Sequence, residues 1–135
     1  MNSHPYLRTY MAGVLLPCWF LLVGLAGLVI SRSVFERHYP LEQVLVFPAA
    51  VVPNLWGLWN VLYVALVQNR RIPLGLWGAL LPLILVPSGL ALQHALSLSL
   101  FGPREVLVVL PVSVALYYLG WKHVVGFFNR VVGVL

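Results

Sequence analysis

Apolar residues fill four long stretches of the chain, and polar residues gather between them. The stretches span residues 10–30, 44–67, 74–92 and 106–128. A helix rises about 1.5 Å per residue, so roughly 20 residues cross the ~30 Å hydrocarbon core of a bilayer. The stretches are apolar on all sides, whereas the strands of a membrane barrel alternate apolar and polar residues. The pattern predicts an all-α integral membrane protein, one domain over residues 1–135 built as a bundle of four transmembrane helices.

The fourth stretch has the least defined ends, because Lys122 interrupts it. A Lys122 side chain that snorkels to the interface would let this helix continue to Phe128, and a start near Leu100 would lengthen its other end. The first stretch is longer than the apolar region of a signal peptide, which has about 7 to 15 residues. We therefore expect the first stretch to be a retained anchor.

The composition agrees with a lipid environment. Of the 135 residues, 61% are hydrophobic and 8% are charged, against about 25% charged residues in an average soluble domain. The formal net charge of +5 comes from scattered cations, with Arg70 and Arg71 as the one adjacent pair. Scattered cations are typical of lipid-headgroup contacts and not of a basic stripe that binds nucleic acid. We expect membrane lipids as partners and no nucleic acid.

The cations also predict how the chain is oriented. Four spans place both termini on one side of the membrane, and five of the eight Lys and Arg residues fall on that side. All three acids, Glu36, Glu42 and Glu105, fall on the other side. Because Lys and Arg concentrate on cytoplasmic segments, we expect both termini in the cytoplasm, with the chain in a bacterial inner membrane.

An internal repeat emerges when the sequence is shifted by 65 residues. Residues 13–17 (GVLLP) then match residues 78–82 (GALLP), and residues 24–26 match residues 89–91. Trp56 meets Trp121 at the same shift. The match predicts a duplicated helical hairpin, with two copies related by an axis along the membrane normal. The alternative is chance similarity between Leu-rich helices.

The second stretch carries the richest set of polar and aromatic residues. Asn54 lies near its middle, directly after Pro53, and a proline there deprives a carbonyl one turn earlier of its helical hydrogen bond. Kinked helices with a polar side chain at the bend line many binding cavities, so Asn54 is a candidate ligand-binding residue. The alternative is that Asn54 bonds to a neighbouring helix and contributes to packing alone.

Four more candidates share one side of this helix. The 3.6-residue period brings together Trp56, Trp59, Asn60 and Tyr63. An aromatic wall with one amide suits a flat or lipid-like ligand. The alternative is an aromatic belt at the membrane–water interface. The belt suits Trp59 and Tyr63 better than Trp56, which lies nearer the middle of the bilayer.

The fourth stretch adds a weakly polar face. Ser113, Tyr117 and Trp121 follow one another at intervals of four residues, and the first two join the candidate ligand-binding residues. Ser88 of the third stretch could complete this interior. Hydroxyls at helix contacts are also ordinary membrane packing, and Trp121 beside Lys122 is typical of the interface.

The sequence offers no evident catalytic machinery. No Asp, Glu, Lys or Arg lies within the stretches up to Trp121, which argues against a proton-coupled pump. One cysteine, Cys18, excludes an intrachain disulfide. No two histidines stand four residues apart on one helix, so we expect no metal site and no cofactor.

We expect a small multi-pass protein that acts as a membrane assembly partner or as a carrier of an apolar or lipid-like molecule. Because four short helices enclose little volume, we also expect a homo-oligomer or a larger membrane complex. The alternative is an enzyme that acts on lipid headgroups through histidines and charged residues of the outer loops. It requires His38 and His94 within hydrogen-bond reach of one pocket, near the other polar residues of these loops, Glu36, Arg37, Glu42, Arg104 and Glu105.

Overall fold

Four helical rods make up the described part of the chain. The computed structural model describes residues 4–35, 48–68, 72–95, 97 and 102–135. Two of the rods are single α-helices, and the other two contain a π-helical segment, in which the backbone winds more widely. The elements are α1 (Pro5–Phe35), α3 (Pro48–Leu62) continued by η1 (Tyr63–Val67), α4 (Leu74–Ala95), and α5 (Pro103–Leu119) continued by η3 (Gly120–Val125) and α6 (Gly126–Val131).

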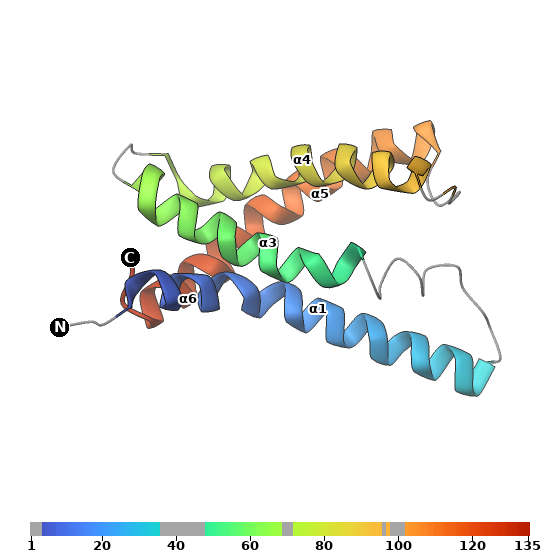
Figure 1. The fold of residues 1–135 in the computed structure, drawn as a ribbon, viewed down its shortest axis with the longest axis horizontal. Helices are drawn as coiled ribbons and strands as arrows, with labels where there is room; N and C mark the ends of the chain where they lie inside the picture. The colour runs from blue at the N-terminus through green and yellow to red at the C-terminus, as the bar shows by residue number, and fades with distance from the viewer. Residues whose placement is uncertain (1–3, 36–47, 69–71, 96, 98–101) are drawn as a thin grey trace.

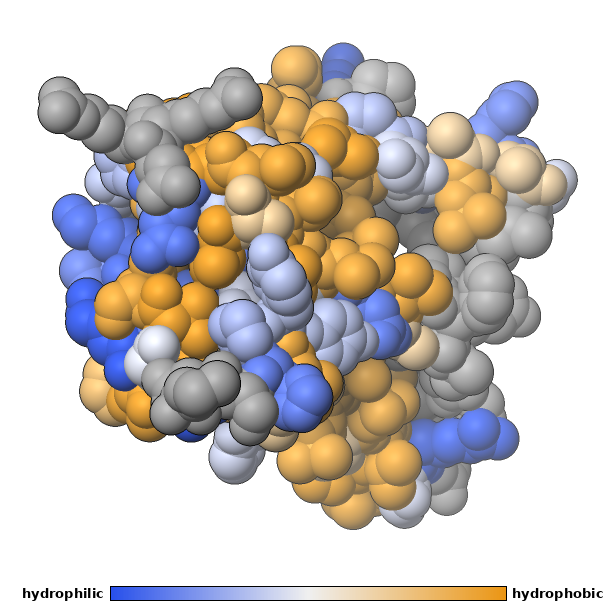
Figure 2. Space-filling view, turned by 60° about the vertical axis from the view of Figure 1, so that its left-hand side comes forward, coloured by the Kyte–Doolittle hydropathy of each residue, from blue (hydrophilic) through white to orange (hydrophobic). Residues whose placement is uncertain are grey.

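Each rod is long and apolar enough to cross a membrane. The candidate spans are Pro5–Phe35, Ala50–Val67, Leu74–Ala95 and Arg104–Val131. Large apolar side chains such as Phe20, Val34 and Leu107 are exposed, and apolar residues cover much of the face in Figure 2. Water would disfavour such a surface, whereas lipid accommodates it. The structure confirms the predicted all-α membrane bundle of four helices.

The rods are arranged as two pairs (Figure 1). The helix α1 packs most extensively on α3, and α4 packs on α5 and η3, whereas α3 and α4 have few contacts. In Figure 1 the two pairs lie close together at the end that carries both chain termini and separate towards the other end. We call the end that carries both chain termini the terminal end. Each pair is one of the two hairpins that the repeat predicts.

Glycines let α1 and α3 approach closely. A Cβ atom on Gly13 would lie 2.8 Å from the Trp56 carbonyl oxygen and 2.9 Å from Cα of Gly57. A Cβ atom on Gly57 would lie 2.6 Å from the Tyr10 ring. Small residues of this kind bring helix backbones together in lipid, where the hydrophobic effect supplies no attraction between helices.

The second hairpin uses the same device. A Cβ atom on Gly78 would lie 2.0 Å from Cγ of Trp121, and one on Gly75 would lie 3.1 Å from Cβ of Lys122. Gly78 therefore holds the space that the Trp121 ring occupies. The ring is fully buried, so Trp121 contributes to helix packing, and its depth in the membrane stays a prediction.

The contacts of the two hairpins correspond at the 65-residue shift. Gly13 meets Trp56 in the first hairpin, and Gly78 meets Trp121 in the second. The ring centroids of Trp56 and Trp121 are themselves 5.3 Å apart. Equivalent residues of two copies touch only near the axis that relates the copies. The Trp56–Trp121 contact joins equivalent positions of the predicted repeat, and the duplication itself stays a prediction of the sequence.

The last rod runs further than the sequence predicts. It continues through Lys122 and His123 without a break and ends at Val131, beyond the predicted limit at Phe128. The π-helical segment η3 contains both ionisable residues. The last candidate span therefore includes Lys122 and His123. The part of this stretch before them, residues 106–121, has no charged side chain.

Replacing Gly78 tests the glycine contact in the second hairpin. We expect Gly78→Ala to lower the free energy of unfolding by about 1–3 kcal/mol, because the new methyl group overlaps the Trp121 ring. Gly89→Ala in the same helix is the matched control, since nothing lies within 4 Å of its Cβ position, and a gain of up to about 1 kcal/mol is expected there. Unfolding by SDS titration in mixed micelles measures both. Equal stability of the two variants would contradict the contact.

Candidate functional site

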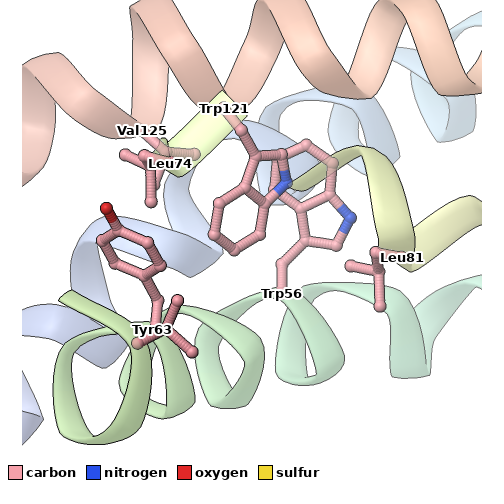
Figure 3. Close-up of a cluster of buried hydrophobic side chains, with 7 residues drawn as sticks. Trp56, Tyr63, Leu74, Leu81, Trp121 and Val125 are labelled. Carbon is pink, nitrogen blue, oxygen red and sulfur yellow. The ribbon is translucent and has the colours of Figure 1, made fainter. Parts of the chain in front are cut away.

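Two tryptophans and a tyrosine meet at the centre of the molecule, where the two hairpins touch. Trp56 of α3 is 5% exposed and Trp121 of η3 is 0% exposed, and Figure 3 shows their rings against each other. The Tyr117 ring of α5 lies 4.8 Å from the Trp56 ring, measured between centroids. Within the described residues, neither indole N–H has a hydrogen-bond acceptor. The cluster is therefore held by ring packing and burial.

A groove opens beside this cluster. Its volume is about 640 Å³, within the usual range of ligand pockets. Three rods form it, because α1, α3 and the α5–η3 rod each contribute side chains. The lining residues are mostly aliphatic and aromatic: Leu16, Pro17, Phe20, Leu21, Val52, Trp56, Leu116, Tyr117, Leu119, Gly120, His123 and Val124.

The π-helical segment η3 shapes one wall of the groove. It supplies Gly120, His123 and Val124. A Cβ atom on Gly120 would lie 3.2 Å from Leu16 of α1, so a side chain at position 120 would crowd Leu16, which also lines the groove. Short π-helical segments recur at functional sites, and here the segment places one imidazole among apolar side chains.

A second apolar groove lies between α4 and α5. Its volume is about 690 Å³. Only one helix pair forms it, and Tyr118 is the one lining residue with a polar side-chain group. The lining residues are Leu76, Ala79, Leu83, Leu110, Pro111, Val114, Ala115, Tyr118 and Leu119. The first groove is the better candidate site because it joins three rods, two aromatic rings and a histidine.

A pair of asparagines closes the bundle at the terminal end. The Asn60 amide nitrogen donates to Asn129 Oδ1 at 2.8 Å, and the Asn129 nitrogen donates back to Asn60 Oδ1 at 3.0 Å. Asn60 also donates to the Thr9 carbonyl of α1 at 2.7 Å. All three residues are fully buried. This network joins α1, α3 and α6. Breaking it would leave buried amides without hydrogen bonds, which costs free energy in an apolar environment.

A reciprocal contact joins α3 to α4. The Trp59 indole donates to the Trp77 carbonyl at 2.9 Å, and the Trp77 indole donates to the Trp59 carbonyl at 3.0 Å. The two rings stack with centroids 4.5 Å apart. Tyr63 donates to the Ile72 carbonyl just before α4 begins. Trp59 and Tyr63 therefore act as a joint between the hairpins.

The remaining predicted residues lie apart from the groove. Asn54 is exposed, and its Oδ1 accepts a hydrogen bond from the Tyr10 hydroxyl. This is the contact with a neighbouring helix that the packing interpretation expects. Ser113 is half-buried and lies outside the groove lining. Ser88 donates to the Ile84 carbonyl of its own helix.

Of the predicted ligand-binding residues, the structure places Trp56 and Tyr117 at the groove. The other residues predicted on the same face of α3 have different partners: Asn60 pairs with Asn129, and Trp59 pairs with Trp77. The sequence did not single out Thr9, Asn129 or Trp77, nor His123 as part of a groove. Their partners lie 18 to 69 residues away, so helical periodicity could not reveal them.

The alternative of an enzyme that uses the outer loops depends on His38 and its neighbours. Residues 36–47, which include His38, lie outside the described residues. His94, Arg104 and Glu105 are described and exposed. In the described ranges no three His, Cys, Asp or Glu side chains gather closely enough to hold a metal ion.

No protein-family model, curated protein or solved structure matches the chain. Fold and site alone therefore define the class: a membrane protein of two packed helical hairpins, with an apolar groove at their junction.

Paired substitutions test the asparagine contact. We expect Asn60→Leu or Asn129→Leu alone to lower the free energy of unfolding by about 1–3 kcal/mol, because each leaves a buried amide unpaired. The double variant should be less destabilised than the sum, by about 0.6–1.7 kcal/mol.

The control for this cycle pairs Asn60→Leu with Ser88→Ala, which removes a bond within one helix. Those two effects should add. SDS titration of the purified variants measures all of them, and additive effects for the asparagine pair would show that the two amides do not interact.

Proposed function

We propose that this protein binds a lipid-like molecule in the groove between its hairpins and acts as a membrane carrier of that molecule. One observation carries the proposal: an apolar groove of about 640 Å³, built by three rods around Trp56 and Tyr117. A surface that only faced bulk lipid would need no such concavity, since convex apolar helices suffice.

The chemistry of the lining favours a long apolar ligand. Leu16, Phe20, Leu21 and Leu116 offer aliphatic and aromatic contact, which gains dispersion energy with an acyl or isoprenoid chain. The Tyr117 hydroxyl and the His123 imidazole are the polar groups in the lining besides the buried Trp56 indole. A few polar groups in an apolar pocket are typical of sites that orient an amphiphile.

The position of the groove also supports binding from within the bilayer. Its lining residues Phe20 and Leu116 are strongly exposed on the outside of the bundle, so a ligand can enter sideways from lipid. The floor is Trp56, which the neighbouring rods fix in place. The cytoplasmic orientation of the terminal end, the bacterial inner membrane and the oligomeric assembly remain predictions of the sequence.

Filling the groove tests the proposal. We expect Val124→Trp to remove bound lipid, because Val124 lines the groove and the larger ring would occupy its volume. Val112→Trp on the same rod is the matched control, since Val112 is exposed and outside the lining. The measurement is the number of lipid molecules per protein that survive purification in mild detergent, by native mass spectrometry.

Wild type and Val112→Trp should each retain about one lipid in the groove between the hairpins, and Val124→Trp should lose that lipid, since each chain has one such groove. Retention of the same lipid by Val124→Trp, or a wild-type protein free of lipid, would refute the proposed function.

A further inference from the structure

His123 has an unusual place for an ionisable residue in a membrane span. It belongs to the groove lining and lies within the apolar helical stretch Arg104–Val131. It lies six positions before Asn129, about 9 Å along a helix axis towards the middle of the rod. Its side chain is exposed, so a molecule in the groove can reach it.

The neighbouring lysine does not share this position. The Lys122 ammonium lies over the Tyr118 ring, 5.6 Å from its centroid, and Cβ of Lys122 faces Gly75 of α4. Lys122 therefore points to the side of the rod that packs on α4. His123 and Val124 instead line the groove, to which α1 also contributes. Among the basic residues that the structure describes, His123 is the one in the groove lining.

The terminal end of the molecule is electropositive. Arg8 lies in the first turn of α1, Lys122 in η3 and Arg130 in the last turn of α6. Glu105, the acid among the described residues, lies in the first turn of α5 at the opposite end of that rod. The field of these cations favours an anion at the end of the groove where His123 lies.

We infer that the occupant of the groove is a lipid with an anionic headgroup, which His123 binds at the end of the groove nearer the termini. This inference rests on the proposed function and names the class of ligand. The imidazole donates a hydrogen bond to a headgroup oxygen, and the positive net charge of the terminal end favours an anion there. The lipid chain then runs along Leu16 and Phe20 towards Leu116, away from the terminal end.

Two lipids with the same chains separate headgroup recognition from groove binding. The delipidated protein in a neutral detergent is titrated with dioleoyl phosphatidylglycerol and with uncharged dioleoylglycerol, and native mass spectrometry follows binding. The wild-type protein should prefer phosphatidylglycerol by about tenfold, as one charge-assisted hydrogen bond provides. His123→Ala should lose this preference, because its affinity for phosphatidylglycerol falls by more than its affinity for dioleoylglycerol.

Two controls accompany His123→Ala. His94→Ala removes an exposed histidine at the far end of α4 and should keep the preference. His123→Lys places another hydrogen-bond donor at this position and should keep the preference as well. The thermal unfolding midpoint of each variant shows that the bundle is intact.

The outcomes distinguish the two proposals. Binding of both lipids without a preference in the wild type overturns the anionic headgroup and leaves groove binding standing. A preference that survives in His123→Ala, or an equal loss of both lipids in that variant, overturns the role of His123. Absence of binding for both lipids in the wild type overturns the proposed function itself.

Discussion

Lipid provides no hydrophobic attraction between apolar helices, and the whole bundle depends on how the chain compensates for that. It does so with close packing and buried hydrogen bonds. Gly13 and Gly57 bring α1 onto α3, and Gly78 admits the Trp121 ring to α4. The Asn60–Asn129 amide pair then binds the last rod to the first two. Few side chains are fully buried, so these contacts account for much of the specific packing.

The same contacts produce the groove. Glycine contacts and the amide network hold the rods together, and the two hairpins separate towards the end away from the termini (Figure 1). Leu16, Leu116 and Gly120 consequently line a space that the protein does not fill. A bound lipid would complete the packing there. Close packing at one end and the groove beside it thus follow from one arrangement.

Much of the fold could be predicted from sequence. Runs of about 20 apolar residues define spans whatever their neighbours are, so the four helices followed directly. The repeat pointed to Gly13, Gly78, Trp56 and Trp121, which the structure places at equivalent contacts. The sequence singled out Trp56 for its place in the middle of its span, and it forms the floor of the groove.

The rest could not be predicted, because it depends on contacts between distant parts of the chain. Nothing near Asn60 in the sequence indicates that Asn129 will face it. The π-helical segment η3 has no motif of its own, yet it buries Trp121 and turns His123 to the groove. Local sequence patterns therefore predict the membrane spans, whereas the groove depends on contacts between the two hairpins that the sequence does not reveal.

Photo-crosslinking tests the central claim most directly, namely that a lipid chain occupies the groove between the hairpins. The protein is reconstituted into liposomes that contain a phospholipid with a diazirine on one acyl chain, irradiated and mapped by peptide mass spectrometry. The account predicts adducts concentrated at Phe20, Leu21 and Leu116, which line the groove. Adducts spread evenly over exposed residues outside it, such as Val29 and Leu107, would contradict the account.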